Sequence, residues 1–592
     1  MRHIGLTRWG NGSTLFLLMA LTAESFAQNS SYNTNSIPIG GTNSTAFGFG
    51  ALAINGGSNN AANGYRVLFN NNFGSYNTAN GSLALYSNTT GSYNSTNGSQ
   101  ALYYNTSGSN NTAIGYQSLY SNTSGDYNTA IGGTALSNNN TGINNTAAGY
   151  GALFSNINGN HNTSSGWGSL ASNISGSSNT AYGSEALFTN TTGSNNSATG
   201  GRSLYSNTTG SRNIATGQLA LYNNTTGGDN CATGYKALFV NTTGQNNSAY
   251  GTGALLDNNT GSFNTACGDN ALSKNNGDSN TASGSRALYS NTSGINNTAI
   301  GYGALYSNTI GISNTAIGTN TLNKNMGGSQ NTAGGFLALY HNTSGFYNTA
   351  SGGYAMYYNT TGDANTATGT GALLNNISGN NNTACGWVAL YNNSSGSFNV
   401  AVGDSAGFNS LGNNNIYIGK RAGYYETGNS KLYMGIDSNK TIIYGDMLTG
   451  QLLLGNKQPN GYIFKGNRTL NVVGGLIADS IRVALNGTWS DYVFADNYQL
   501  RPLDELDNYI KMNHHLPGIP TAKEVANDGI ELASLNAKLL EKIEEITLYI
   551  LQQQKLIESQ AQQIETQNKY FNSLQTQINE IKNNMVISQK KE

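Results

Sequence analysis

A glycine returns every seventeen residues along most of this chain. Twenty-one such glycines run from Gly64 to Gly403, and nineteen of the twenty spacings are 17 residues. The exception, from Gly268 to Gly284, is 16 residues. A fixed period of this size is typical of stacked repeats, in which each unit contacts only its neighbours. The period therefore predicts a solenoid and argues against a globular enzyme fold.

Four positions of the repeat hold almost everywhere. A leucine lies four residues after the glycine, an asparagine seven after it, a second glycine ten after it and an alanine two before it. Positions are numbered here by their offset from the periodic glycine, so that Gly115 is position 0 and Leu119 is position +4. The structural ladder that we expect includes Gly98, Gly115, Gly132, Leu102, Leu119, Leu136, Asn105, Asn122 and Asn139.

Stacked β-coils give this pattern a physical cause. In a parallel β-solenoid, equivalent residues of successive coils lie about 4.8 Å apart. The leucines then form an apolar spine, the asparagine amides form a hydrogen-bonded ladder, and the glycines supply corners with positive φ or close backbone approach. Seventeen residues allow two short strands and two turns per coil, and we expect about 22 coils extending roughly 105 Å. A helical fold is excluded because glycine and asparagine at this density destabilise helices.

Two further rows of the repeat suggest surface roles. Position +5 is often aromatic, which predicts a seam between coils or chains, or else an exposed stripe that binds sugar. Its members are Tyr86, Tyr103, Tyr120, Phe154, Phe188, Tyr205, Tyr222, Phe239, Tyr289 and Tyr306. Paired threonines in the N-T-T-G segment, such as Thr89–Thr90 and Thr208–Thr209, suggest a flat hydroxyl array that binds ice or a crystal surface. Calcium binding is not expected, because aspartate recurs at no fixed phase.

The N-terminus has the pattern of a secretory signal peptide. Arg2 and Arg8 precede an apolar run over 14–23, and Ser25-Phe26-Ala27 matches a cleavage site. We therefore expect a signal peptide over 1–27 and a linker or cap over 28–42. No other segment reaches about 18 apolar residues, so no membrane span is expected. The formal net charge of −1 gives no reason to expect nucleic-acid binding.

Neither the cysteines nor the histidines predict a metal site or cofactor. The three cysteines, Cys231, Cys267 and Cys385, lack the spacing of a disulfide framework or a zinc site. His514 and His515 are adjacent, and neighbouring histidines rarely chelate one ion. We expect no metal and no cofactor.

The C-terminal part changes character in three steps. The repeat shaft is expected over 43–440, a β-rich neck with strands near 471–477 and 480–483 over 441–486, and a mixed α/β junction over 487–533. A coiled coil follows over 534–586, with nearly seven heptads. Isoleucine dominates its a positions, which fits three strands as well as two. Glutamines at three d positions are expected to fix register, with a bound anion or water between them as the alternative. The predicted oligomerisation residues are Ile543, Ile546, Ile550, Gln553, Ile557, Gln560, Ile564 and Gln567.

The repeat resembles the head repeats of trimeric autotransporter adhesins. The N-T-A-x-G-x-x-A-L pattern over about 43–440 carries this resemblance. It implies a left-handed parallel β-roll, a homotrimer, and display on the outer surface of a Gram-negative bacterium. Those heads generally use coils of about fourteen residues. The adhesins themselves end in a membrane-embedded β-barrel segment, which the polar C-terminal helix here does not resemble.

The C-terminal stretch is similar to a terminal module of Bacteroidetes surface and tail-fibre-like proteins. Its layout resembles the self-cleaving intramolecular chaperone of phage tail spikes, whose nucleophile is a serine followed by aspartate. Ser490-Asp491 match that pair, but the basic residues that follow it in the family are missing, and an unactivated serine is a poor nucleophile. We expect no enzyme activity, with autocleavage at Ser490 as the weak alternative.

These observations predict a secreted or cell-surface homotrimeric fibre with a repetitive adhesive surface. Its expected partners are further copies of itself and a host, matrix or glycan surface. A tail-fibre-like protein with a self-cleaving C-terminal domain is the first alternative, and an ice- or crystal-surface binder is the second.

Overall fold

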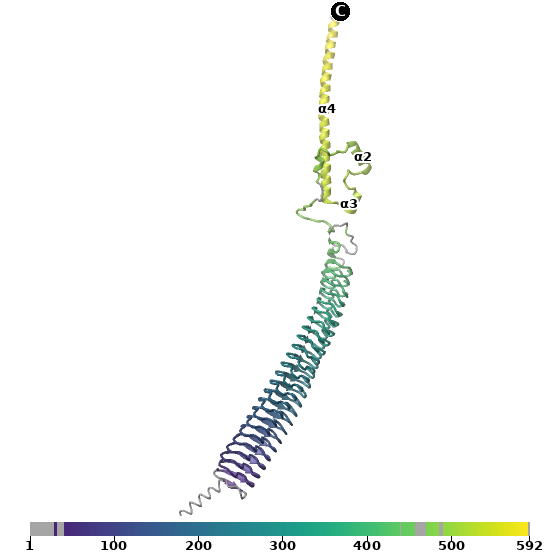
Figure 1. Cartoon of the computed structure of the whole chain (residues 1–592). Coiled ribbons are helices and arrows are strands. Elements are labelled where there is room, and N and C mark those ends of the chain that lie inside the picture. The colour runs from purple at the N-terminus through teal and green to yellow at the C-terminus, as the bar shows by residue number, and fades with distance from the viewer. Residues whose placement is uncertain are drawn as a thin grey trace, which may run out of the picture. The chain divides into compact units, whose positions relative to one another are not determined.

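The computed structural model describes residues 29–31, 41–437, 440–455, 464, 469–484 and 489–589. The chain divides into two compact units, Met1–Gly461 and Tyr462–Glu592. The expected signal peptide and most of the expected 28–42 linker lie outside the described residues. The first unit is a stack of coils, and the second is dominated by one long helix (Figure 1).

The first unit is a parallel β-solenoid. Each strand from β2 to β24 pairs in parallel with the next, one strand per coil, so that the 24 coils from β2 to β25 extend for about 110 Å. The predicted fold is confirmed. The parallel strands are β1 (Asn29–Ser31), β2 (Ser44–Phe47), β3 (Ala61–Asn63), β4 (Thr78–Asn80), β5 (Ser95–Asn97), β6 (Thr112–Ile114), β7 (Thr129–Ile131), β8 (Thr146–Ala148), β9 (Thr163–Ser165), β10 (Thr180–Tyr182), β11 (Ser197–Thr199), β12 (Ile214–Thr216), β13 (Cys231–Thr233), β14 (Ser248–Tyr250), β15 (Thr265–Cys267), β16 (Thr281–Ser283), β17 (Thr298–Ile300), β18 (Thr315–Ile317), β19 (Thr332–Gly334), β20 (Thr349–Ser351), β21 (Thr366–Thr368), β22 (Thr383–Cys385), β23 (Val400–Val402), β24 (Ile416–Ile418) and β25 (Lys431–Gly435).

Each coil contains one strand, although seventeen residues allow two. The strand carries alanine at its centre, as in Thr112-Ala113-Ile114. The arm that carries the leucine does not form a second strand, because its backbone repeatedly enters the left-handed region. In one coil this holds for Gly115 (φ 131°), Gln117 (φ 53°) and Leu119 (φ 51°). Leu119 still donates its backbone N–H to Ala135 O of the next coil, at 2.9 Å.

The core is narrow and is closed within a single chain. The leucine at position +4 and the alanines at −2 and +3 are almost all inaccessible to solvent, as Leu102, Ala101 and Ala113 illustrate. Only small side chains fit opposite the leucine, which explains why alanine recurs. The shaft therefore buries its apolar spine without help from another copy.

Coils of 16 residues keep their place in the stack. The coil after Gly268 is one residue shorter than the 17-residue coils, and the shortening lies in the turn that follows the buried asparagine. There Asn275 Nδ2 donates to Gly277 O two residues on, at 2.7 Å, whereas Asn122 donates to Gly125 O three residues on, at 3.0 Å. The strand β16 that follows remains in register with β15.

The last coils close the solenoid with aromatic residues and an antiparallel hairpin. Strand β25 pairs antiparallel with β26 (Thr441–Asp446), which pairs antiparallel with β27 (Gln451–Leu454). Tyr417 stands where earlier coils have alanine, and it is fully buried. Tyr433 follows it in the next strand, with ring centroids 5.9 Å apart.

The second unit is mainly helical. Its elements are the strand β28 (Leu470–Val472), the 3₁₀ helix η2 (Ser490–Phe494), and the helices α2 (Leu503–Asn513), α3 (Ala522–Asp528) and α4 (Leu532–Ser588). Residues 480–483 do not form the expected strand, and Ile481 and Val483 are exposed. The described part of 487–533 contains helices and no strand, in contrast to the expected mixture. The predicted long C-terminal helix is confirmed.

Candidate functional site

The predicted asparagine ladder at position +7 runs through the core. Asn105 Nδ2 donates to Asn88 Oδ1 at 2.8 Å, and Asn122 Nδ2 donates to Asn105 Oδ1 at 2.7 Å. Asn139 continues the series at 2.7 Å. The second hydrogen of each amide goes to the position +10 glycine carbonyl of its own coil. These asparagines are fully buried, so the ladder satisfies polar groups that would otherwise be costly.

A second asparagine ladder, at position −4, was not predicted. Asn128 Oδ1 accepts from the backbone N–H of Asn145 at 3.0 Å, and Asn128 Nδ2 donates to Gly142 O at 2.9 Å. The same glycine carbonyl accepts from Asn139 of the first ladder at 3.0 Å. The two ladders therefore meet at the position +10 carbonyl. The signal was present in the sequence, because asparagine at −4 recurs as regularly as asparagine at +7.

The glycine at position +10 is required by close approach between coils. A Cβ on Gly108 would lie 2.4 Å from Asn105 Oδ1 and 2.5 Å from Gly125 O. At position 0, a Cβ on Gly115 would lie 2.5 Å from Gly132 O, and φ is +131°. Both predicted roles of the glycines, positive φ and close approach, are present.

The aromatic row at position +5 stacks between coils. Tyr86 and Tyr103 have ring centroids 5.1 Å apart, and Tyr103 and Tyr120 have centroids 5.3 Å apart. A second run joins Phe188, Tyr205, Tyr222 and Phe239 at 5.1–5.3 Å. The interpretation as an inter-coil seam is confirmed. Each of these rings is mostly covered by its neighbours, so the row offers little surface to a ligand.

The threonines of the turn use their hydroxyl hydrogens within the stack. Thr89 Oγ1 donates to Thr106 O of the next coil at 2.7 Å, and Thr208 Oγ1 donates to Thr225 O at 3.0 Å. The first threonine of each pair therefore braces neighbouring coils. This contact weakens the case for a free hydroxyl array on the turn.

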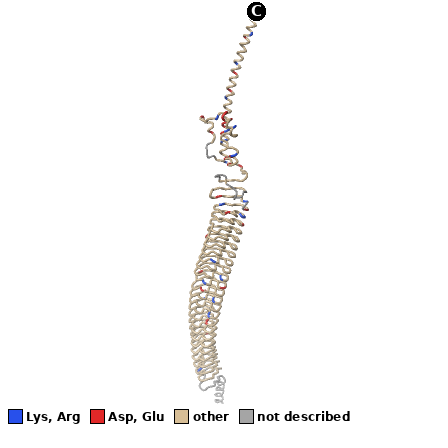
Figure 2. Tube along the Cα trace, turned by 90° about the vertical axis from the view of Figure 1, so that its right-hand side faces the viewer, with Lys and Arg blue, Asp and Glu red and all other residues tan. Residues whose placement is uncertain are grey.

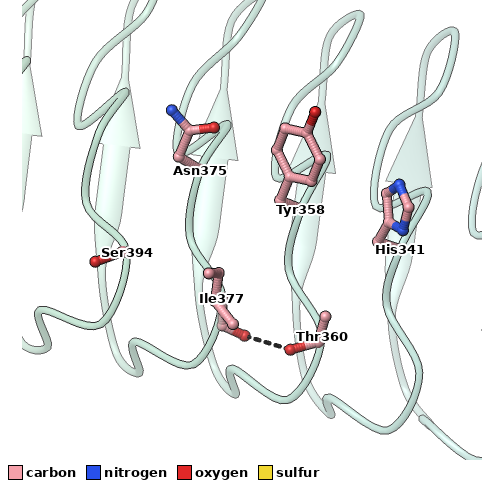
Figure 3. A pocket seen from close by; sticks show the side chains of 6 residues that line it. All are labelled: His341, Tyr358, Thr360, Asn375, Ile377 and Ser394. Atoms are coloured by element: carbon pink, nitrogen blue, oxygen red, sulfur yellow. Dashed lines mark hydrogen bonds between the residues drawn. The ribbon is translucent and has the colours of Figure 1, made fainter.

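A hollow lies on the shaft between the rows at positions +6 and +8. Its volume is about 510 Å³, and it is open to solvent along one side. Figure 3 shows the three +6 side chains in one line and the three +8 side chains in a parallel line below them. The hollow is lined by His341, Tyr358 and Asn375 at +6 and by Thr360, Ile377 and Ser394 at +8.

A second hollow, of about 840 Å³, has the same place in the repeat much earlier in the chain. It too lies between the +6 and +8 rows. Its lining comprises Ser87, Tyr104, Ser121, Asn138, Ser155, Thr106, Thr123, Asn140, Ile157 and Ile174. Neither lining contains lysine, arginine, aspartate or glutamate. Burial, helped by Lys324, lowers the pKa of His341, so that hollow is uncharged at neutral pH.

Ser490 has a structural contact and is not arranged as a nucleophile. It begins η2, it is buried, and its Oγ donates to Ala537 O of α4 at 2.8 Å. The neighbouring Asp491 is exposed. The hydroxyl hydrogen that a general base would remove is therefore held by a backbone carbonyl.

The start of α4 is fixed to η2 and the segment that follows it by a polar network. Tyr492 donates to Glu541 at 2.6 Å, and Tyr498 donates to Glu545. Lys542 lies between the two carboxylates, 2.7 Å from Glu541 and 2.9 Å from Glu545. Charged residues are sparse along the coils and gather around this network (Figure 2).

The rest of α4 exposes its predicted a and d side chains. Ile550 is 58% exposed and Ile557 is 57% exposed. Ile543, Ile546 and Ile564 are exposed to a similar degree, and Gln553, Gln560 and Gln567 lie exposed on the same helix. Exposure of this row of isoleucines to water is thermodynamically unfavourable.

The cysteines and adjacent histidines do not assemble into a site. Cys231, Cys267 and Cys385 are free thiols, and Cys231 Sγ lies 3.3 Å from the Tyr250 hydroxyl. His515 Nδ1 lies 2.9 Å from the carbonyl oxygen of Leu516. Within the described residues, His, Cys, Asp and Glu form no group of three that could hold a metal ion. Within the same residues, no helix has both the length and the apolar character needed to cross a membrane.

Comparisons of the chain with protein-family models, with curated proteins and with solved structures find no match. The geometry of the shaft and of α4 is therefore the basis for assigning a function.

Proposed function

We propose that this protein is a homotrimeric structural fibre, exported from the cell, whose shaft presents a repetitive binding surface. The observation that carries the proposal is the contrast between the two units. The solenoid closes its apolar core within one chain, whereas α4 leaves its a and d isoleucines exposed. The shaft thus needs no partner to fold, and the helix does.

Further copies of α4 are the partner that fits this surface. Heptads with isoleucine at a and apolar residues at several d positions bury one another in a parallel coiled coil. Glutamines at three successive d positions favour one axial alignment, because a shifted helix would place them against isoleucine. Parallel association at α4 would hold several shafts together, so that weak contacts along each shaft would add by avidity.

The oligomer is tested by sedimentation of the full-length chain with paired substitutions. Ile550→Lys with Ile557→Lys places two charges at a positions, whereas the control, Gln552→Lys with Gln562→Lys, places them at the outward c and f positions. We expect a trimeric mass for the native chain and the control, and a monomer for the a-position variant. A monomeric native chain would refute the proposal.

Export is supported by the signal-peptide pattern of residues 1–27, and adhesive display by the repetitive face of the shaft that carries the two hollows. Mass spectrometry of protein recovered from the cell exterior tests export. We expect a mature N-terminus at Gln28, and protein that stays inside the cell with Met1 in place would contradict it.

A further inference from the structure

We infer that the hollows between the +6 and +8 rows bind an uncharged polysaccharide that lies along the shaft. This inference names the ligand class of the binding surface in the proposed function, and so rests on it. It starts from an arrangement of rings that recurs at two distant places in the chain.

In both hollows, a ring at position +6 stands edge-on to rings of the +5 seam. Tyr358 meets Tyr357 with centroids 4.6 Å apart and planes at 88°. Tyr104 meets Tyr103 at 4.7 Å and 81°. Edge-to-face packing fixes the orientation of the +6 ring while part of the ring remains exposed. Tyr358 is 46% exposed and Tyr104 is 47% exposed, so each hollow has a fixed aromatic wall.

A fixed aromatic face with hydroxyl and amide groups nearby suits a sugar. The ring face packs against the C–H face of a pyranose, and the polar groups bind its hydroxyls. In the first hollow, His341 stacks on Tyr358 at 5.4 Å, which extends the wall across two coils. Asn375 Nδ2 donates to Asn392 at 2.9 Å, and Figure 3 shows its Oδ1 turned toward Tyr358 as an acceptor.

Hydrogen bonds between coils fix the orientation of the threonine hydroxyls opposite the aromatic wall. Thr360 Oγ1 donates to Ile377 O at 3.0 Å, which leaves its lone pairs to accept from a ligand hydroxyl. Thr106 makes the same contact with Thr123 O at 2.9 Å in the second hollow. Neither lining contains a charged side chain, and Lys324, at +6 in the coil before His341, lies outside the first lining. At the lining residues themselves, a charged polymer would therefore lose hydration without a counter-charge. A neutral chain meets no such cost.

The direction of the hollows favours a polymer over a small sugar. The first hollow spans three coils at +6, about 10 Å of the shaft at the strand spacing. The second extends over more coils at the same phase. Both run parallel to the axis of the stack, so an extended chain can occupy successive coils, and many such contacts add along one fibre.

The test is affinity electrophoresis of the full-length protein in native gels containing a neutral polysaccharide. Laminarin, xyloglucan and dextran serve as separate probes, with alginate and heparin as charged counterparts. We expect retardation by at least one neutral probe and by neither charged one. The double variant Tyr104→Ala with Tyr358→Ala should weaken binding by about 2- to 10-fold per ring lost.

A matched control separates the hollows from general exposure of tyrosine. Tyr127 and Tyr347, at position +12, are 60% and 64% exposed and line neither hollow. Tyr127→Ala with Tyr347→Ala should leave retardation unchanged. Equal loss in both double variants, or no retardation by any neutral probe, would overturn the inference. A trimer that is not retarded refutes this inference alone, whereas a retarded monomer refutes only the oligomer.

Discussion

The ring of Tyr417 lies against Gly423, in the space that a leucine side chain fills in other coils. A Cβ on Gly423 would lie 2.2 Å from Tyr417 Cδ1, and a Cβ on Gly407 would lie 2.5 Å from Tyr417 Cδ2. Both glycines occupy position +4, where other coils carry leucine. One tyrosine at position −2 thus replaces two leucines, and its hydroxyl lies 3.0 Å from Ser410 Oγ.

Restoring the consensus leucine at this site is expected to destabilise the protein. Gly423 has φ 60°, close to the 51° that leucine adopts elsewhere at +4, so the backbone accepts the change. The clash with Tyr417 does not relax easily, and overpacking of this kind costs about 1–3 kcal/mol. Hydrogen exchange of 417–433 in Gly423→Leu should accelerate. Adding Tyr417→Ala and Gly407→Leu should restore protection, and failure of that rescue would contradict the packing argument.

Removing one rung of the first asparagine ladder should destabilise the coils around it. Asn122→Ala leaves Asn105 Oδ1 and one hydrogen of Asn139 Nδ2 without a partner, whereas Gly125 O keeps the hydrogen bond from Asn111 Nδ2. Each buried group left unpaired costs about 1–3 kcal/mol. The exposed Asn138→Ala is the control. Guanidinium unfolding monitored by circular dichroism should show a lower midpoint for Asn122→Ala only. Equal midpoints would mean that water replaces the lost amide.

The contact between η2 and α4 should weaken in acid. Partial burial alone would raise the pKa of Glu541, but hydrogen bonds from Lys542 and Tyr492 outweigh it and lower that pKa below 4.5. A carboxyl with a lowered folded-state pKa stabilises the fold above its unfolded value, and this stability is lost as pH falls through the folded value. The melting temperature of α4 should therefore fall on acidification from pH 5.

The same contact should persist far into alkali. The hydrogen bond to Glu541 raises the pKa of Tyr492 to about 12. An acid whose pKa is raised on folding contributes stability below its unfolded value, near 10, and loses it as pH rises through 12.

Glu541→Gln should flatten the acid side of the plot of melting temperature against pH. An unchanged acid side in that variant would assign the pH dependence to another group.

Ser490→Ala should leave the chain at its native length and lower its stability slightly. The substitution removes one hydrogen bond to Ala537 O, worth about 1 kcal/mol. Denaturing electrophoresis of native and variant protein checks this outcome. A native chain that splits near residue 490, together with a variant that stays intact, would instead establish autocleavage.

Much of the shaft was predictable because its constraints repeat. Leu119 and Asn122 recur at one phase, and only an inward position tolerates so little variation along a solenoid. The second ladder at Asn128 carried the same signal, but asparagine beside threonine also suits a turn, and its burial was missed. The shaft's single strand per coil was not predictable, since leucine with φ near 51° is contrary to its ordinary preference.

For the candidate binding surface, the aromatic character was predicted but the position in the repeat was not. The sequence placed aromatics at +5 and suggested a sugar stripe there, yet Tyr103 and Tyr120 stack on each other between coils. Exposed rings such as Tyr358 lie one residue later, at a position where serine and asparagine are more common. Aromatic residues occur at +6 in only a few coils, so a consensus of the repeat does not show them. A ligand site needs rings at particular coils and does not need one in every coil.

The 16-residue coil after Gly268 has a consequence for how such a shaft changes length. Its missing residue is absorbed in one turn while β15 and β16 stay in register. Small deletions at that turn therefore leave the neighbouring coils intact, and duplication of a whole coil adds about 4.8 Å without creating a new kind of contact. The length of the shaft therefore scales with the number of coils, in steps of about 4.8 Å.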